Sequence, residues 1–269
     1  MKKQDILTPI GLILVFGVVL YGISQGKTGI RPFVDPASLA ITIGGSFAAV
    51  LITFSLDDIK QVPKAVKISI TSNNVYKMDL VDQFKEISRI VRKDGVLAIE
   101  QDVSEMEDPF LKKGLELVID GIEPENVKEI LETELASKES MYEQGSKFFK
   151  IWGSYAPAFG MIGTLIGLIQ MLVDMGSPDD IASGMSVALI TTFYGALFAN
   201  GIFNPIGYNI QGKGEKEVEA LEMMISGIMS IQNGDSTRTI EEKLVTFLNA
   251  KERKAYYTRD GNEDSVNAA

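Results

Sequence analysis

The sequence contains no cysteine and no histidine. These absences exclude disulfides, thiol nucleophiles, zinc sites built from these residues, and imidazole acid–base catalysis. A surplus of basic residues is also lacking: the formal net charge is -10, whereas a nucleic-acid-binding protein needs a basic surface to neutralise phosphates. We therefore expect neither an enzyme nor a nucleic-acid-binding protein, and no cofactor or bound metal.

Apolar residues, by contrast, are abundant, and they are concentrated in four blocks. These blocks cover residues 6–24, 37–56, 148–173 and 181–209. A helix needs about 20 largely apolar residues to cross the hydrocarbon core of a bilayer, and each block reaches or approaches that length. The sequence therefore predicts an all-α membrane protein with four transmembrane helices, in contact with lipid.

The chain then divides into four parts. Transmembrane helices 1 and 2 are expected in residues 1–56, a helical cytoplasmic domain in 57–147, and transmembrane helices 3 and 4 in 148–209. A cytoplasmic helix is expected to follow in 210–269, with a disordered polar tail after about Lys251. Lysines flank one side of the spans, whereas the opposite loops contain only Lys27 and Arg31. Because Lys and Arg favour the cytoplasmic side, both termini should be cytoplasmic.

Local signals fix several helix starts. Asp35, Asp108 and Ser177 each stand directly before a proline. Such a side chain can accept hydrogen bonds from free N–H groups, and proline at the first helical position loses none. Amphipathic spacing predicts further helices at 59–70, 78–91 and 110–120. No strong breaker separates residue 124 from the third span, so one long helix is expected to run from there into the membrane.

Small residues recur at spacings of three and four on one face of each of the last two spans. They are Gly153, Ala156, Gly160, Gly163 and Gly167, and then Gly184, Ala188, Thr192, Gly195 and Ala199. Small residues let helices approach closely. Two interpretations stay open: tight packing of these helices, or the lining of a narrow path around a partner helix. In the second case Gly160, Gly163 and Ala188 are candidate lining residues.

Prolines and threonines interrupt the apolar pattern of the same two spans. Pro157 and Pro205 remove backbone hydrogen bonds, which indicates either a functional bend or a tolerated kink. Thr164, Thr191 and Thr192 add hydroxyls. These hydroxyls can bond their own helix, or they can act as oxygen ligands for a hard cation such as Na⁺.

Charge is missing where an ion-coupled protein normally has it. Residues 151–173 and 181–210 contain no Asp, Glu, Lys or Arg. Ion-coupled membrane proteins place an ionisable residue at bilayer depth, so here another polypeptide must supply it. Outside the spans, Arg92, Lys93 and Glu100 flank an apolar run. This cluster is either a solvated surface or a dock for a complementary charged partner.

Four segments carry a resemblance to a known family. They are Val91–Glu100 (VRKDGVLAIE), Tyr155–Thr164 (YAPAFGMIGT), Val187–Gly195 (VALITTFYG) and Phe203–Ile206 (FNPI). The chain resembles the MotA/PomA branch of the MotA/TolQ/ExbB proton channel family, whose members are stator proteins of the flagellar motor. The resemblance implies a homopentameric ring around two transmembrane helices of MotB. It also implies that MotB supplies the ion-carrying aspartate, and that ion-motive force drives motility and chemotaxis.

The resemblance also assigns roles to residues. Arg92 and Glu100, with Lys93 as an auxiliary charge, match positions that engage the rotor protein FliG. The two prolines match positions that couple ion flow to rotation. The three threonines match positions that are hydroxylated in sodium-driven members, which favours Na⁺ over H⁺ as the transported ion. Some members have aspartate where this chain has Ser154, so a role for that acid does not carry over.

The alternative to a stator protein is another type of protein in the same family. Energisers of the ExbB or TolQ type also lack their own ion carboxylate and drive envelope transport systems, but they typically have three spans. The number of spans therefore separates the two possibilities.

Overall fold

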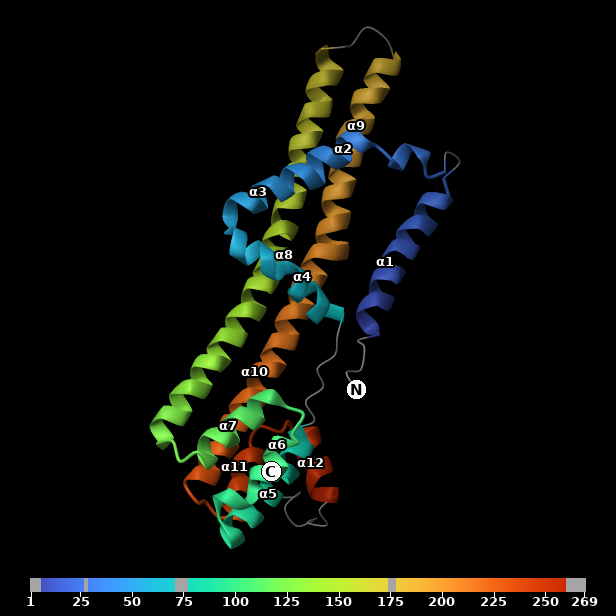
Figure 1. Ribbon diagram of the computed structural model, residues 1–269. Helices are drawn as coiled ribbons and strands as arrows, with labels where there is room; N and C mark the ends of the chain where they lie inside the picture. Colours follow the sequence, from blue (N-terminus) through green and yellow to red (C-terminus); the bar gives the residue numbers. More distant parts are fainter. Residues whose placement is uncertain (1–5, 27–28, 71–76, 174–177, 260–269) are drawn as a thin grey trace. The chain divides into compact units, whose positions relative to one another are not determined.

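The computed structural model describes residues 6–26, 29–70, 77–173 and 178–259, and every regular element among them is helical (Figure 1). The chain packs into two units. Met1–Asn73 with Ser140–Gly214 form the first, called the spanning unit below. Asn74–Glu139 with Glu215–Ala269 form the second, called the charged unit.

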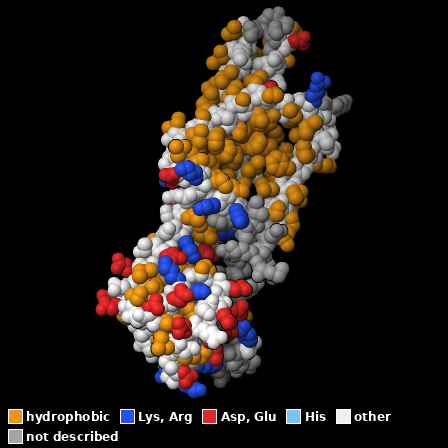
Figure 2. All heavy atoms as spheres, viewed as in Figure 1, with side chains coloured by type: hydrophobic (Ala, Val, Ile, Leu, Met, Phe, Trp, Pro, Cys, Tyr) orange, Lys and Arg blue, Asp and Glu red, His pale blue; other side chains and the backbone are white. Residues whose placement is uncertain are grey.

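Four helical segments are long and apolar enough to cross a membrane. They are Leu7–Ser24, Arg31–Thr53, Pro124–Val173 and Ile181–Gln232. In Figure 2, hydrophobic side chains gather over the helices of the spanning unit, whereas acidic and basic side chains gather over the charged unit. The prediction of an all-α membrane protein with four transmembrane helices is confirmed.

The spanning unit contains the first two spans and the apolar parts of the third and fourth. Its elements are α1 (Leu7–Ser24), η1 (Arg31–Phe33), α2 (Pro36–Leu39), η2 (Ala40–Gly44), α3 (Gly45–Thr53), α4 (Leu56–Ile70), the second part of α8 (Pro124–Val173), α9 (Pro178–Phe198), η4 (Ala199–Phe203) and the start of α10 (Asn204–Gln232). The second span is thus built from short pieces, and η2 and η4 are π-helical turns. The expected long helix into the third span is confirmed as α8.

The predicted helix starts hold where the structure describes them. The Asp35 carboxylate accepts a hydrogen bond from the N–H of Ser38 (2.8 Å) and begins α2. The Asp108 carboxylate accepts from the N–H groups of Phe110 and Leu111, at 2.9 and 3.0 Å, and begins α7 (Pro109–Ile119). Helix α9 starts at Pro178, and Ser177 lies outside the described residues.

The charged unit combines two stretches of chain that the sequence analysis assigned to separate domains. Its elements are α5 (Lys77–Asp94), η3 (Val96–Ile99), α6 (Glu100–Ser104), α7, the first part of α8, the second part of α10, α11 (Thr237–Val245) and α12 (Ala250–Arg259). One core joins them, with Phe84, Leu115 and Ile228 fully buried. A Cβ atom at Gly227 of α10 would lie 2.5 Å from the ring of Phe84 in α5, so these helices touch closely.

The expected disordered tail after about Lys251 is wrong as far as Arg259. Helix α12 docks on the charged unit through Tyr256, whose side chain is fully buried. Its hydroxyl donates to Glu241 (2.7 Å) and accepts from Lys85 (2.9 Å), and Lys85 also pairs with Glu241 at 2.8 Å. Burial raises the pKa of the Tyr256 phenol, so it stays protonated as a donor. Residues 260–269 lie outside the described residues.

Candidate functional site

The small-residue stripe brings helices α8 and α9 into backbone contact. A Cβ at Gly160 would lie 2.9 Å from the carbonyl oxygen of Thr191, and one at Gly167 would lie 2.7 Å from the Gly184 carbonyl oxygen. On α9, a Cβ at Gly195 would lie 2.8 Å from the Ala156 carbonyl oxygen. Within one chain, the stripe therefore packs α8 tightly against α9, which is the first of the two interpretations. Gly160, Gly163 and Ala188 are buried in this contact.

Two of the three threonines meet beside this contact. The hydroxyls of Thr164 on α8 and Thr192 on α9 lie 2.5 Å apart. The Ala188 carbonyl oxygen is 2.9 Å from the Thr164 hydroxyl and 3.3 Å from the Thr192 hydroxyl. The Gly160 carbonyl oxygen is 3.1 Å from Thr164. Thr164 is half-buried and Thr192 is exposed, so this oxygen cluster is accessible from outside the helix pair.

The oxygen cluster has more acceptors than protons. Each hydroxyl carries one proton, whereas every oxygen in the cluster offers lone pairs. Oxygen ligands without net charge suit a hard cation such as Na⁺, or the hydrogen bonds of a protonated carboxyl group. The geometry therefore allows the cluster to contact an ion or its carrier without any charged residue of this chain.

Thr191 lies apart from the other two threonines. Its side chain is fully buried, and its hydroxyl donates to the carbonyls of Val187 (2.9 Å) and Ala188 (3.1 Å) on its own helix. Its methyl side packs against Gly163, where an added Cβ would lie 2.5 Å away. Its carbonyl accepts a hydrogen bond from the Thr42 hydroxyl of η2 at 3.4 Å. In this chain Thr191 therefore connects α9 with α8 and with the second span.

The two prolines have different local structures. Pro157 sits inside α8, which stays helical through it, and its Cα would be 3.0 Å from a Cβ at Gly195. Pro205 is the second residue after the π-helical turn η4, and the N–H of the residue between them, Asn204, donates to the carbonyl of Ala199. A π-helical turn is rare and is frequently found at functional sites, and its wider spacing relieves the clash that a proline ring causes. The type of helix thus changes next to Pro205, whereas the chain stays α-helical through Pro157.

An aromatic contact that the sequence analysis missed holds η4 in place. The rings of Trp152 on α8 and Phe203 on η4 stack with centroids 4.0 Å apart. The indole N–H of Trp152 donates to the Ser46 hydroxyl on α3 at 3.0 Å. Trp152 therefore links three spans next to the π-turn. A signal was present, because it is the only tryptophan of the chain and lies in a span.

The charged residues singled out in the charged unit lie on one exposed corner. Arg92 and Lys93 end α5, Glu100 begins α6, and all three are exposed. The turn between them needs Gly95, whose φ of 87° is unfavourable for other residues. In the intervening η3, Ile99 is fully buried, but Leu97 is 71% exposed. The corner therefore combines both signs of charge with a projecting apolar side chain.

Comparisons with known proteins agree with one another, and the relatives and solved structures cover nearly the whole chain. Residues 102–223 match the model of the MotA/TolQ/ExbB proton channel family. The uncharacterized protein YtxD of Bacillus subtilis (strain 168) is 39% identical over 94% of this chain and 93% of its own length. Motility protein A of Borreliella burgdorferi is 36% identical, covering 97% of this chain and all of that protein. The solved flagellar MotAB stator complex from Bacillus subtilis matches with a TM-score of 0.85 at 31% identity, over 94% of this chain and 99% of that chain.

Proposed function

Because the chain belongs to the MotA/TolQ/ExbB proton channel family, we propose that it forms an ion pathway with a MotB partner and converts ion-motive force into torque. Its function is that of a flagellar stator subunit, not of an enzyme. Four candidate spans and the full-length likeness to motility protein A disfavour the ExbB or TolQ alternative. The oxygen cluster at Thr164 and Thr192, within the uncharged stretches 151–173 and 181–210, is the observation that supports the pathway most directly.

The partner supplies the charge in this proposal. Spans three and four have no ionisable residue in 151–173 or 181–210. A carboxylate of MotB, held against the oxygen cluster, would bind the ion arriving from outside and lose its charge. A ligand shifts a conformational equilibrium only through different affinities for two states, and this neutralisation provides that difference. Repeated around a pentameric ring, the shift becomes rotation.

Sodium is the favoured ion, with H⁺ as the alternative. The Thr164 and Thr192 hydroxyls and the Ala188 carbonyl offer oxygen atoms, which are the ligands that hard cations prefer. Gly160, Gly163 and Ala188 contribute by keeping α8 and α9 close enough for the two hydroxyls to meet. Thr191 does not face the oxygen cluster but holds α9 in position, through its contacts with Gly163 on α8 and Thr42 on η2.

The prolines and the exposed corner connect ion binding with the rotor. Pro157 lies against α9 and Pro205 follows the π-turn, so a change at the oxygen cluster can alter helix geometry on either side. Helix α8 continues without a break from the spanning unit into residues of the charged unit. Arg92, Lys93 and Glu100 would engage FliG, with Leu97 as an apolar centre inside a charged rim.

The proposed location is the cytoplasmic (inner) membrane, with both termini and the charged unit in the cytoplasm. Lys60, Lys64, Lys67, Lys147, Lys150, Lys213 and Lys216 lie on one side of the spans. Arg31 is the basic residue among the described ones on the other side. This imbalance supports the orientation through the preference of Lys and Arg for the cytoplasmic face.

Reconstitution tests the dependence on a partner. Vesicles that contain this chain alone are expected to show no ion uptake, because residues 151–173 and 181–210, which form the proposed pathway, contain no Asp, Glu, Lys or Arg. Vesicles with the complex of this chain and MotB should show uptake, measured with fluorescent Na⁺ and H⁺ indicators. Swimming speed of a complemented strain, recorded as Na⁺ is varied at constant pH, then identifies the ion. Ion uptake by the chain alone would contradict the proposal that a carboxylate of MotB carries the ion.

Charge reversal tests the exposed corner. Arg92→Glu and Glu100→Lys are each expected to reduce torque several-fold while leaving membrane insertion and ion uptake unchanged, because both side chains are exposed. Opposite reversals in FliG should restore torque. Leu97→Ser should also reduce torque, without rescue by rotor charges. Torque is measured from the rotation of tethered cells, with Arg238→Glu on α11 as an exposed control. Normal swimming of all three variants would mean that the corner is only solvated surface.

A further inference from the structure

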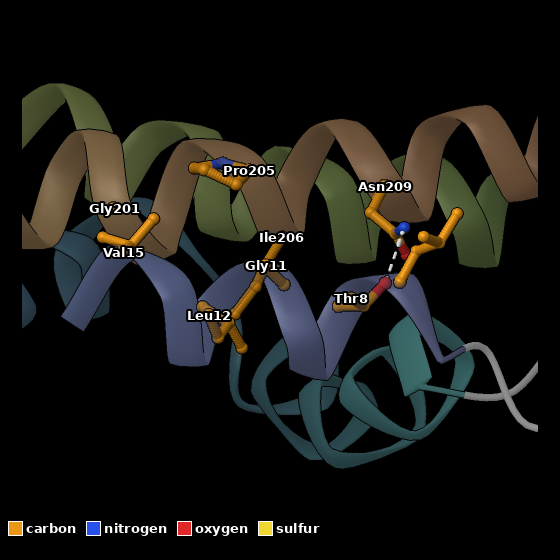
Figure 3. A pocket seen from close by; sticks show the side chains of 9 residues that line it. Thr8, Gly11, Leu12, Val15, Gly201, Pro205, Ile206 and Asn209 are labelled. Atoms are coloured by element: carbon orange, nitrogen blue, oxygen red, sulfur yellow. Dashed lines mark hydrogen bonds between the residues drawn. The ribbon is translucent and has the colours of Figure 1, made fainter. Parts of the chain in front are cut away.

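A cavity of about 310 Å³ lies in the spanning unit between α1 and the segment formed by η4 and α10 (Figure 3). One face of α1 lines it with Thr8, Leu12 and Val15, and the opposite side contributes Pro205 and Asn209. Its volume lies at the lower end of the range of small-molecule sites, about 300–1,000 Å³. None of the α1 residues is buried, which shows that α1 is only loosely packed against η4 and α10.

The cavity is polar at one end and apolar at the other. Thr8 and Asn209 lie together at one end in Figure 3, and Val15 and Gly201 lie at the other. Thr8 is close to the start of the first span and Asn209 to the end of the fourth apolar block. With a rise of 1.5 Å per residue, the apolar end lies about 10 Å deeper in the membrane. A lipid leaflet has the same arrangement, with polar headgroups at the membrane surface and apolar acyl chains deeper inside.

The polar end has an unused hydrogen-bonding atom. The Asn209 amide N–H donates to the Thr8 hydroxyl at 3.1 Å. The amide oxygen of Asn209 is buried and has no hydrogen-bond partner. A buried polar atom without a partner costs free energy, so a donor reaching this end is favoured. Lys213 does not line the cavity, but it follows Asn209 by four residues, about one turn of α10, and so places a positive charge beyond this end.

We propose that the cavity binds one anionic phospholipid from the leaflet on the side of Thr8 and Asn209. Its acyl chain lies along Leu12 and Val15, a headgroup hydroxyl donates to the Asn209 amide oxygen, and its phosphate faces Lys213. A zwitterionic lipid lacks the net charge that favours the Lys213 end. Because Pro205 lines the cavity, the bound lipid also contacts α10 directly after the π-turn.

The test uses the complex of this chain with MotB, purified in detergent and titrated with phosphatidylglycerol or phosphatidylcholine during native mass spectrometry. Gly11→Leu should fill the cavity, because Gly11 lines it and nothing lies within 4 Å of an added Cβ. Gly17→Leu is the matched control, since Gly17 is on the same helix with the same open surroundings but does not line the cavity. Asn209→Leu and Lys213→Gln test the headgroup contacts.

The wild-type complex and Gly17→Leu should retain phosphatidylglycerol, with at least about fivefold preference over phosphatidylcholine, and Gly11→Leu should lose it. Asn209→Leu and Lys213→Gln should each weaken retention by about fivefold or more. Equal retention by Gly11→Leu and wild type would overturn the site. Equal retention of both lipids would overturn headgroup recognition, because it would show that lipid attaches to the complex without regard to its headgroup. No retained lipid in the wild-type complex would mean that protein covers the cavity.

Discussion

A Gly160→Val variant is expected not to accumulate as a folded protein. A Cβ at residue 160 would lie 2.9 Å from the Thr191 carbonyl oxygen and 3.4 Å from the Cα atoms of Thr192 and Gly195. These are backbone atoms of α9, so no side-chain rotation relieves the clash. Overpacking a well-packed contact costs about 1–3 kcal/mol, and a rigid backbone neighbour places this variant at the upper end. Membrane-inserted protein and its melting temperature, followed by size-exclusion chromatography, measure the effect.

The control for this variant is Gly17→Val on α1, where nothing lies within 4 Å of the added Cβ. Both substitutions place the same β-branched residue in an apolar span, so helix propensity is matched. The control should accumulate and melt like the wild type. A normal melting temperature for Gly160→Val would show that α8 and α9 do not rely on this backbone contact.

Thr164→Val is expected to leave the protein folded and to reduce ion uptake by the MotB complex about tenfold or more. Valine keeps the shape of threonine but removes the hydroxyl that approaches Thr192, Ala188 and Gly160. A hydrogen bond to a charged group contributes about 1.5–3 kcal/mol, which corresponds to a tenfold or larger change in an equilibrium. Ion uptake into vesicles and the Na⁺ dependence of swimming speed are the measurements.

Thr191→Val is the matched control for the oxygen cluster. It removes a hydroxyl from the next residue of the same helix as Thr192, but one that donates to its own backbone and lies away from the cluster. Ion uptake should stay within about twofold of the wild type, because buried hydroxyls bonded to their own helix contribute little beyond packing. Loss of uptake in Thr191→Val, with normal uptake in Thr164→Val, would place the pathway on the other face of α9.

The charged unit shows why domain boundaries were harder to predict than helices. Amphipathic spacing located α5 and α7, since the signal lies within the helix itself. The contact between Phe84 and Gly227 joins residues far apart in the sequence, and no local pattern reports it. Helix α12 was missed for the same reason. It is polar, and the residues that hold it lie elsewhere in the sequence: Lys85 and Glu241 contact Tyr256, and Asp79 pairs with Arg259.

Four helical spans could be predicted from the amino-acid pattern alone, and so could the absence of Asp, Glu, Lys and Arg from residues 151–173 and 181–210. Span length, proline position and the absence of ionisable residues are properties of continuous segments, and the bilayer acts on each segment separately. The hydroxyls that come together, in contrast, follow from the packing of one helix against another. Consecutive residues differ by about 100° around a helix, so Thr191 and Thr192 face different sides. Which of them meets Thr164 depends on the glycine contacts that fix the rotation of α9 against α8.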